Sequence, residues 1–289
     1  MKNPILPALF TGASCAVTCL AFAAAAQALA AQTVVLVQDT FTLNETRTGG
    51  SNLAGTSPEQ QAGSTGNGTW KTGTGSPSGK FSAEGTIVRA SDAAENIAVE
   101  MRIAIPQPIA VTTVSASIVN ATSDWLAIGF LGSDTSSAQA WFGNNDTILW
   151  VMIRPSGSWQ VFKNATTTTL ASGTFSGFSP TATYTLGISY DPTTQMARAF
   201  LSDGNTETSL ASANDGWFAT GLTADTSITA TGFRIHPNNN GGTLSGASSV
   251  DNFLVTTLAT AAIPEPRTAT LTLVGLVLSG LAIGRLARR

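Results

Sequence analysis

The chain is poor in the side chains on which most catalytic and metal sites are built. Its 289 residues include two cysteines and one histidine, and only 11% of them are charged. Both cysteines, Cys15 and Cys19, lie in an apolar stretch near the N-terminus. The remaining chain therefore has no thiol nucleophile, disulfide or thiolate metal site. A single histidine also excludes a zinc site that needs two.

Basic side chains are scarce as well. Residues 31–263 hold nine lysines and arginines against sixteen aspartates and glutamates, a net charge of −7. We therefore expect no nucleic-acid partner. No phosphate loop or dinucleotide fingerprint is present, because the glycine-rich stretches precede strand-like segments rather than helices. Abundant Thr, Ser, Gly, Asn and Ala suit an exported β-protein.

The N-terminal segment has the pattern of a secretory signal. Lys2 supplies a positive charge, residues 5–26 are apolar, and Ala28 and Ala30 are small. This order predicts a signal peptide over residues 1–30, cleaved after Ala30. No leucine-containing lipoprotein box precedes the two cysteines, so we interpret them as part of the apolar stretch.

A second apolar run lies near the C-terminus. Residues 268–284 carry no charge and would extend about 25 Å as a helix, close to the minimum for a bilayer. Arg285, Arg288 and Arg289 follow, and such a basic cluster tends to stay cytoplasmic, which places the preceding residues outside. An amphipathic helix packed on the domain is the alternative, but the run has no polar face. We expect a transmembrane helix.

Pro264, Glu265 and Pro266 precede this helix, and the prolines keep the peptide extended. The order of signal peptide, polar ectodomain, Pro-Glu-Pro, apolar helix and basic tail resembles the PEP-CTERM family of bacterial exported proteins. The resemblance covers residues 263–289, with Ile263 where many members carry Val. It implies recognition by an exosortase-type membrane enzyme, transient inner-membrane anchoring and a final place at the surface or in the matrix of a Gram-negative bacterium that makes exopolysaccharide.

Residues 31–262 are long enough for one large domain with its own core. Helical periodicity is nearly absent, and alternating apolar runs are separated by Gly, Asn, Asp, Ser and Pro. The expected strands lie in residues 96–105, 113–121, 124–132, 147–164, 183–204, 231–237 and 250–258, with turns at 155–157 and 191–192. They predict an all-β fold, a two-sheet antiparallel jelly-roll sandwich, flanked by the N-terminal signal helix and the C-terminal transmembrane helix.

The order of the segments resembles concanavalin-like jelly rolls of the laminin-G and legume-lectin type. The opening part has an Asp-x-Phe pair, a Leu-x-Gly-x-x-Pro loop and a tryptophan. These are Asp39, Phe41, Leu53, Gly55, Pro58 and Trp70. The resemblance implies that the last strand, in residues 248–258, returns beside the first. Residues 46–80, rich in Gly and Ser, are expected to form a long irregular loop. A shared fold does not fix function.

The domain shows no catalytic pattern. Glucan hydrolases of this fold carry Glu-x-Asp-x-Glu on one strand, so that three carboxylates share a face. No glutamate here stands in that pattern, and we expect Glu100 to be a solvated residue opposite its apolar neighbours. His236 has no nucleophile among residues 232–242 and is interpreted as a turn residue. We expect no enzymatic activity.

Two asparagine-rich stretches could hold Ca²⁺ through oxygen ligands. One contains Asn144, Asn145 and Asp146, and the other is the run 238–240. The same residues suit ordinary turns, which is the interpretation we favour. No other cofactor is expected.

Tryptophan is the remaining candidate for function. Sugar sites stack a pyranose ring on an aromatic face and use Asn or Asp for the hydroxyls, as Trp141 beside Asn144 and Trp217 beside Asp215 could do. The alternative is that the tryptophans fill the core. That alternative stays open for Trp125 and Trp159, and we assign Trp150 to the core.

Together these features predict an exported surface or matrix protein that binds carbohydrate in an exopolysaccharide layer. A glycosylated structural matrix protein without a discrete site is the alternative. A divergent glycoside hydrolase is the third candidate.

Overall fold

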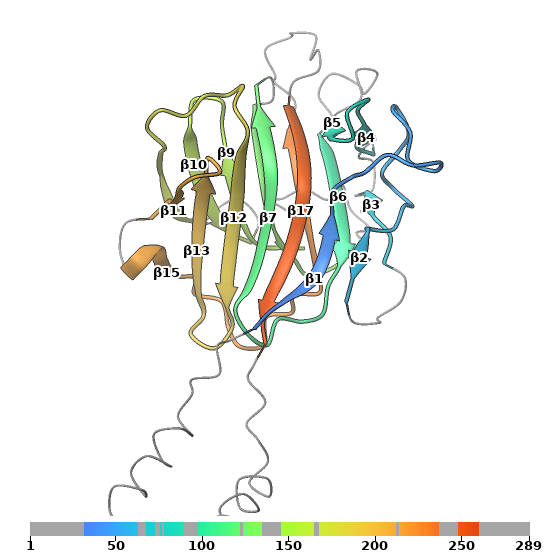
Figure 1. Cartoon of the computed structure of the whole chain (residues 1–289). Coiled ribbons are helices and arrows are strands. Elements are labelled where there is room, and N and C mark those ends of the chain that lie inside the picture. Colours follow the sequence, from blue (N-terminus) through green and yellow to red (C-terminus); the bar gives the residue numbers. More distant parts are fainter. Residues whose placement is uncertain are drawn as a thin grey trace, which may run out of the picture. The chain divides into compact units, whose positions relative to one another are not determined.

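Two antiparallel β-sheets lie face to face in the computed structural model of the chain (Figure 1). The structure describes residues 32–62, 68–72, 76, 78–88, 98–121, 124–134, 146–164, 168–211, 214–236 and 248–259. The predicted signal peptide and sorting segment lie outside these ranges. No helix in the described part of the chain is both long and apolar enough to cross a membrane.

The first sheet has ten strands. Its main path runs β14 (Glu207–Ser209), β13 (Met196–Ser202), β12 (Tyr184–Asp191), β7 (Thr112–Asn120), β17 (Ser248–Leu258), β1 (Thr33–Asp39) and β2 (Gln60–Gln61). Beside this path, β15 (Trp217–Ala219) pairs with β13, β5 (Ile87–Val88) pairs with β17, and β4 (Lys80–Phe81) pairs with β5. The pairing of β1 with β17 confirms that the last strand returns beside the first.

The second sheet has seven strands. Their order is β11 (Thr168–Thr174), β10 (Ser158–Lys163), β9 (Thr147–Ile153), β8 (Trp125–Leu131), β16 (Ala230–His236), β6 (Val99–Ala104) and β3 (Lys71–Thr72). The hairpins β9–β10 and β12–β13 confirm the two predicted turns. In the first turn Gly157 has a φ of 79°, a conformation that glycine adopts without strain.

The core lies between the sheets. Val99, Met101 and Ile103 of β6 point into it, as their alternation predicts. Trp159 of β10 also lies in this core. Because successive side chains of a strand point to opposite faces, the residues between them form the outer faces of the sandwich.

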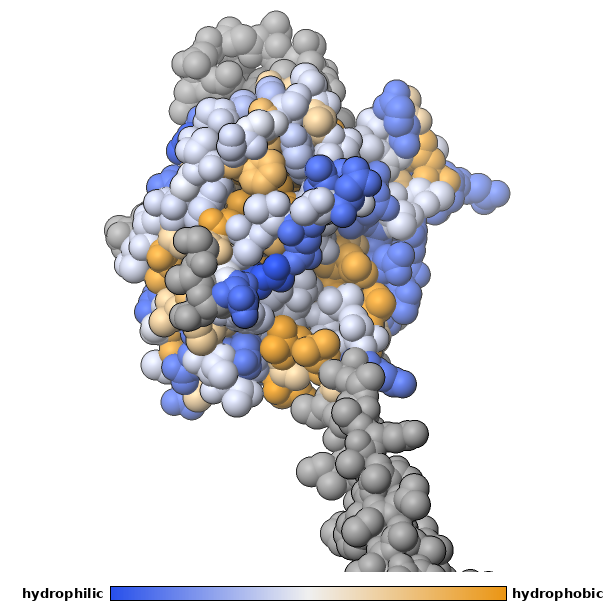
Figure 2. Space-filling model, turned by 60° about the vertical axis from the view of Figure 1, so that its left-hand side comes forward, coloured by the Kyte–Doolittle hydropathy of each residue, from blue (hydrophilic) through white to orange (hydrophobic). Residues whose placement is uncertain are grey.

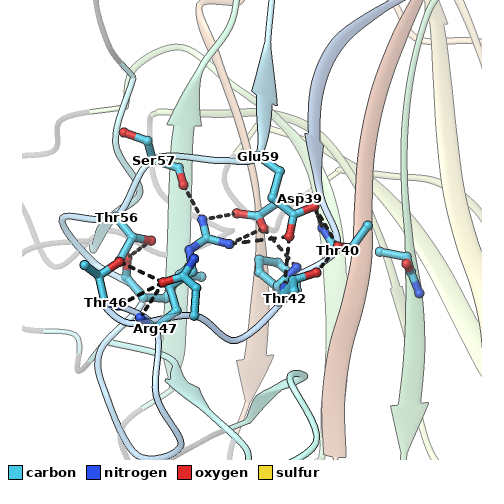
Figure 3. A network of polar contacts seen from close by, with 12 residues as sticks. Asp39, Thr40, Thr42, Thr46, Arg47, Thr56, Ser57 and Glu59 are labelled. Atoms are coloured by element: carbon cyan, nitrogen blue, oxygen red, sulfur yellow. Dashed lines mark hydrogen bonds and ion pairs between the residues drawn. The ribbon is translucent and has the colours of Figure 1, made fainter.

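A buried ion pair holds the irregular segment that follows β1 (Figure 3). Arg47 donates to both carboxylate oxygens of Asp39, at 2.7 and 2.9 Å, and the indole N–H of Trp70 donates to the same carboxylate at 2.7 Å. Phe41, Leu53 and Trp70 are fully buried in the main core. The residues of the opening pattern are therefore structural, since they attach the loop to the sandwich.

The chain enters and leaves the sandwich at the same end. Thr33 pairs with Leu258, and in Figure 1 β1 begins and β17 ends at the lower end. The opposite, upper end is where β16 ends at His236 and β17 begins. The 132–146 connection therefore starts at the lower end and the 237–247 connection at the upper end. Residues 144–145 and 238–240 of the asparagine-rich stretches lie outside the described residues, but the described residues that adjoin them, Asp146 and His236, lie at opposite ends of the sheets.

Candidate functional site

A row of stacked aromatic side chains crosses the outer face of the seven-stranded sheet. Trp150 of β9 stacks on Phe162 of β10 with centroids 4.5 Å apart, and Trp125 of β8 lies 5.8 Å from Trp150. His236 of β16 stacks on Trp125 at 4.6 Å. With Met152 and neighbouring apolar residues, the tryptophans and Phe162 form a hydrophobic cluster separate from the main core.

Charged residues continue this row on β6 and β16. Glu100 accepts a hydrogen bond of 2.6 Å from Nε of Arg102, and both side chains are fully buried. Arg234 lies over the ring of Trp125 at 4.5 Å. Burial lowers the pKa of the Arg234 guanidinium to about 9, which the negative charge of Glu100 opposes. The guanidinium therefore stays protonated at neutral pH.

Two sequence-based interpretations need correction here. Glu100 does point away from the core, but it is buried beside Arg102 rather than solvated, because the outer face of this sheet also carries packed side chains. His236 is the last residue of β16 rather than a turn residue. Its Nδ1 lies 3.7 Å from a carboxylate oxygen of Asp124, and its ring is stacked on Trp125.

The aromatic row is closed to a sugar. The exposed fractions of Trp125, Trp150 and Phe162 lie between 1 and 9%, since the rings use their faces to stack on each other. The prediction that Trp150 is buried is confirmed, although it packs in the outer cluster and not in the main core. These described aromatic side chains therefore stabilise the sheet and leave no ring face open for stacking.

A more accessible aromatic site surrounds Trp217, at the edge of the ten-stranded sheet. Trp217 is the first residue of β15, is half-buried, and pairs with Arg198 of β13. Directly opposed residues of an antiparallel pair share one face, with Cβ atoms about 5 Å apart. Arg198 donates a hydrogen bond of 2.5 Å to Glu207, and both keep part of their surface in solvent. Trp217 thus stands opposite Arg198 in the strand pairing, while the Arg198 guanidinium lies over the ring of Phe200 at 5.7 Å and binds Glu207.

The turn before Trp217 carries a further polar residue, Asp215. Asp215 is exposed and has a φ of 54°, in a short 3₁₀ turn over Asn214–Gly216. We name Trp217, Arg198, Glu207 and Asp215 the edge site. In Figure 2, where this side of the domain comes forward, polar residues alternate with small apolar patches. Arg198 and Glu207 were not predicted, although alternation along β13 could have placed Arg198 on the outer face.

The other predicted site residues do not extend the edge site. Trp141, Asn144 and Asn145 lie outside the described residues. A carboxylate oxygen of Asp146 lies 3.7 Å from Nη1 of Arg102, the cation that also binds Glu100. Within the described ranges, no three His, Cys, Asp or Glu side chains are grouped as a metal site would require.

Solved structures with a similar arrangement of strands include lectins. The lumenal domain of VIP36 with Ca²⁺ and Man2 bound has a TM-score of 0.47 and 13% identity, covering 73% of this chain and 90% of its own. Lectin I from Ulex europaeus, in complex with the methyl glycoside of α-L-fucose, has a TM-score of 0.46 and 12% identity, covering 66% and 92%. The lectin UEA-II, complexed with galactose, has a TM-score of 0.46 and 11% identity, covering 67% and 93%.

No protein-family model matches the chain, and neither does any curated protein. The identities and TM-scores above are too low to carry a sugar site or a calcium site over to this chain. Its architecture follows from its own strand pairing, which is all-β with two antiparallel sheets.

Proposed function

We propose that this chain is an exported surface or matrix protein that binds carbohydrate at the edge site and is sorted by an exosortase-type enzyme. One observation supports the binding most directly. Trp217 is a half-buried tryptophan on an outer face, opposite Arg198 in the strand pairing and two residues after the exposed Asp215, and Arg198 is paired with Glu207. An aromatic face with polar groups next to it suits a pyranose, whose C–H face stacks and whose hydroxyls hydrogen-bond.

Each residue of the edge site has a distinct role in this proposal. The indole of Trp217 supplies the stacking surface, and Asp215 accepts hydrogen bonds from sugar hydroxyls. Arg198 donates to ring or hydroxyl oxygens while Glu207 holds it in place. Because β13 and β15 are both strands of the sheet, the site is preformed, which lowers the entropy cost of binding.

A titration against glycans tests the binding. Residues 31–262 are titrated with a glycan panel and with the exopolysaccharide of the host, with calcium and with chelator. We expect saturable binding that Trp217→Ala abolishes. Phe175→Ala is the matched control, since Phe175 is also a half-buried aromatic, packed on Tyr184 at 6.1 Å. Equal binding by the Trp217→Ala variant would refute the edge site, and loss in chelator would assign calcium to the binding.

The sorting proposal rests on Pro264, Glu265 and Pro266, the apolar run 268–284 and the terminal arginines Arg285, Arg288 and Arg289. It is tested by expressing the full chain with and without an exosortase-type enzyme. We expect a shorter product only when the enzyme is present and Pro-Glu-Pro is intact. A full-length product in both strains would refute the sorting.

A glycosylated structural matrix protein remains the alternative. It is favoured by β11, an edge strand that is mostly exposed and has hydroxyl side chains at four of its seven positions, Thr168, Thr169, Ser172 and Thr174. If no glycan binds to the purified domain and mass spectrometry finds sugars on β11, this alternative replaces carbohydrate binding.

A further inference from the structure

The exposed apolar side chains of the domain gather at one end. In the described part of the chain, three large apolar residues are exposed: Ile109 at 76%, Val34 at 39% and Leu258 at 37%. Val34 is next to the start of β1, Leu258 ends β17, and the backbone N–H of Leu258 donates to the carbonyl of Val111. We name these three residues the apolar end. Figure 2 shows apolar surface at the lower end of the domain, where β1 begins and β17 ends.

The loop that presents Ile109 is held in place. Residues 105–111 connect β6 to β7 and contain two prolines and no charged residue. The Gln107 side chain donates to the carbonyl of Thr226 at 3.0 Å and accepts from the N–H of Ile228 at 2.7 Å. The N–H of Ile105 donates to the carbonyl of Thr229. The 105–111 loop is thus hydrogen-bonded to the segment before β16, so the backbone that presents Ile109 to solvent is fixed.

We propose that the apolar end rests on the bilayer surface while the C-terminal helix is inserted, an inference that depends on the membrane tail of the proposed function. Nine residues, 259–267, join β17 to the apolar run, and nine extended residues reach about 30 Å. The tether leaves from the apolar end itself. The end therefore stays close to the lipid, where even a weak attraction suffices because the encounter is intramolecular.

The partner is a lipid surface rather than a protein groove for two reasons. The three side chains are on separate elements at the rim of the sandwich, an arrangement that suits insertion into headgroups more than the binding of a helix. The 105–111 loop carries no charge, so none of its own side chains has to leave water as an ion when it enters the interface. In this pose the upper end of the sandwich faces away from the membrane.

The absence of cysteine after residue 30 allows a clean test with single cysteines. The mature chain, residues 31–289, is reconstituted into liposomes and labelled at Ile109→Cys with an environment-sensitive dye. Lipids carrying a quencher just below the headgroups report contact. Ser156→Cys, an exposed position in the β9–β10 turn at the upper end, is the matched control. Ala282→Cys reports insertion of the apolar run.

We expect a blue shift and quenching at residue 109 and neither at residue 156. With the dye at Val34→Cys, Ile109→Asp should lower the ratio of docked to undocked domain by about tenfold, since one buried aliphatic side chain is removed. Quenching at residue 282 without quenching at residue 109 would overturn the inference and leave the membrane tail intact. No quenching at residue 282 would overturn the membrane tail and the inference together.

The same experiment also distinguishes a lipid surface from a protein segment that covers the apolar end. A blue shift at residue 109 that is already present in detergent and gains no quenching from lipid would mean that a segment of this chain or a second copy covers it. That result would overturn the lipid surface as the partner.

Discussion

Replacing Asp39 by alanine tests how the opening segment is held on the sandwich. The Asp39 carboxylate accepts two hydrogen bonds from Arg47, one from the Trp70 indole and one of 2.9 Å from the N–H of Phe41. Asp39 and Arg47 are both buried. The substitution leaves a buried guanidinium without its counter-charge and a buried indole N–H without its acceptor.

The expected cost follows from these two losses. Removing one partner of a buried ion pair costs about 3–5 kcal/mol. A buried donor left without an acceptor costs about 1–3 kcal/mol more. Arg47 keeps the carbonyl of Ser57 as an acceptor and has Glu59 at 3.8 Å, which reduces the loss. We therefore expect the free energy of unfolding to fall by about 4 kcal/mol in total.

Urea unfolding of residues 31–262, followed by tryptophan fluorescence and circular dichroism, measures this change. The midpoint should fall while the slope stays constant, since the same surface is exposed on unfolding. The double variant Asp39→Ala/Arg47→Met removes the unpaired charge and should recover about 2 kcal/mol. A loss below about 1 kcal/mol for Asp39→Ala, the value of an exposed pair, would refute the reasoning. So would a double variant less stable than either single one.

Three further substitutions follow from local geometry and titration. Burial raises the pKa of Asp251, so this carboxyl binds its proton more tightly in the folded than in the unfolded protein. The stability of the protein therefore falls as pH rises from the ordinary pKa of 3.8 through the raised pKa. Asp251→Asn should raise the thermal midpoint at pH 7 and leave it unchanged below pH 3. For Glu59, burial raises the pKa, but hydrogen bonds from Thr40 and Thr42 outweigh it and lower the pKa. The ionised Glu59 carboxylate therefore stabilises the folded protein above its ordinary pKa, and this stabilisation is lost as pH falls through the lowered pKa. The thermal midpoint of Glu59→Gln should accordingly fall less on acidification than that of the unsubstituted protein. Gly157→Ala should cost about 1–2 kcal/mol in urea unfolding, because φ is 79° and the new Cβ would lie 2.8 Å from a backbone oxygen.

Strands that alternate against one core were predictable from the sequence. The spacing of Val99, Met101 and Ile103 identified β6 and its buried face, and proline and glycine at residues 155–157 identified the β9–β10 turn. β11 was not predicted, because an exposed edge strand of Thr, Ser, Ala and Gly shows no alternation. The two-residue strands of the 46–80 loop were missed because their pairing depends on distant partners.

Side chains on fully apolar strands could not be assigned to a face. All seven residues of β8 are buried, so period-two reasoning could not show that Trp125 lies outside the main core. The burial of Glu100 was missed for the same reason, since a polar residue between apolar ones is solvated only if nothing packs on that face. The face became known only when neighbouring strands were paired.

By itself, the sequence determined the all-β class, the main hairpins and the residues that fill the core, because these depend on side-chain alternation and turn residues close in the chain. It also singled out Trp217 and Asp215, which are neighbours in sequence. Only the tertiary structure decided that Arg198, which is paired with Glu207, stands opposite Trp217, and that Val34, Ile109 and Leu258 share one end. Those residues come from separate strands and loops, and only sheet register and strand direction bring them together in space.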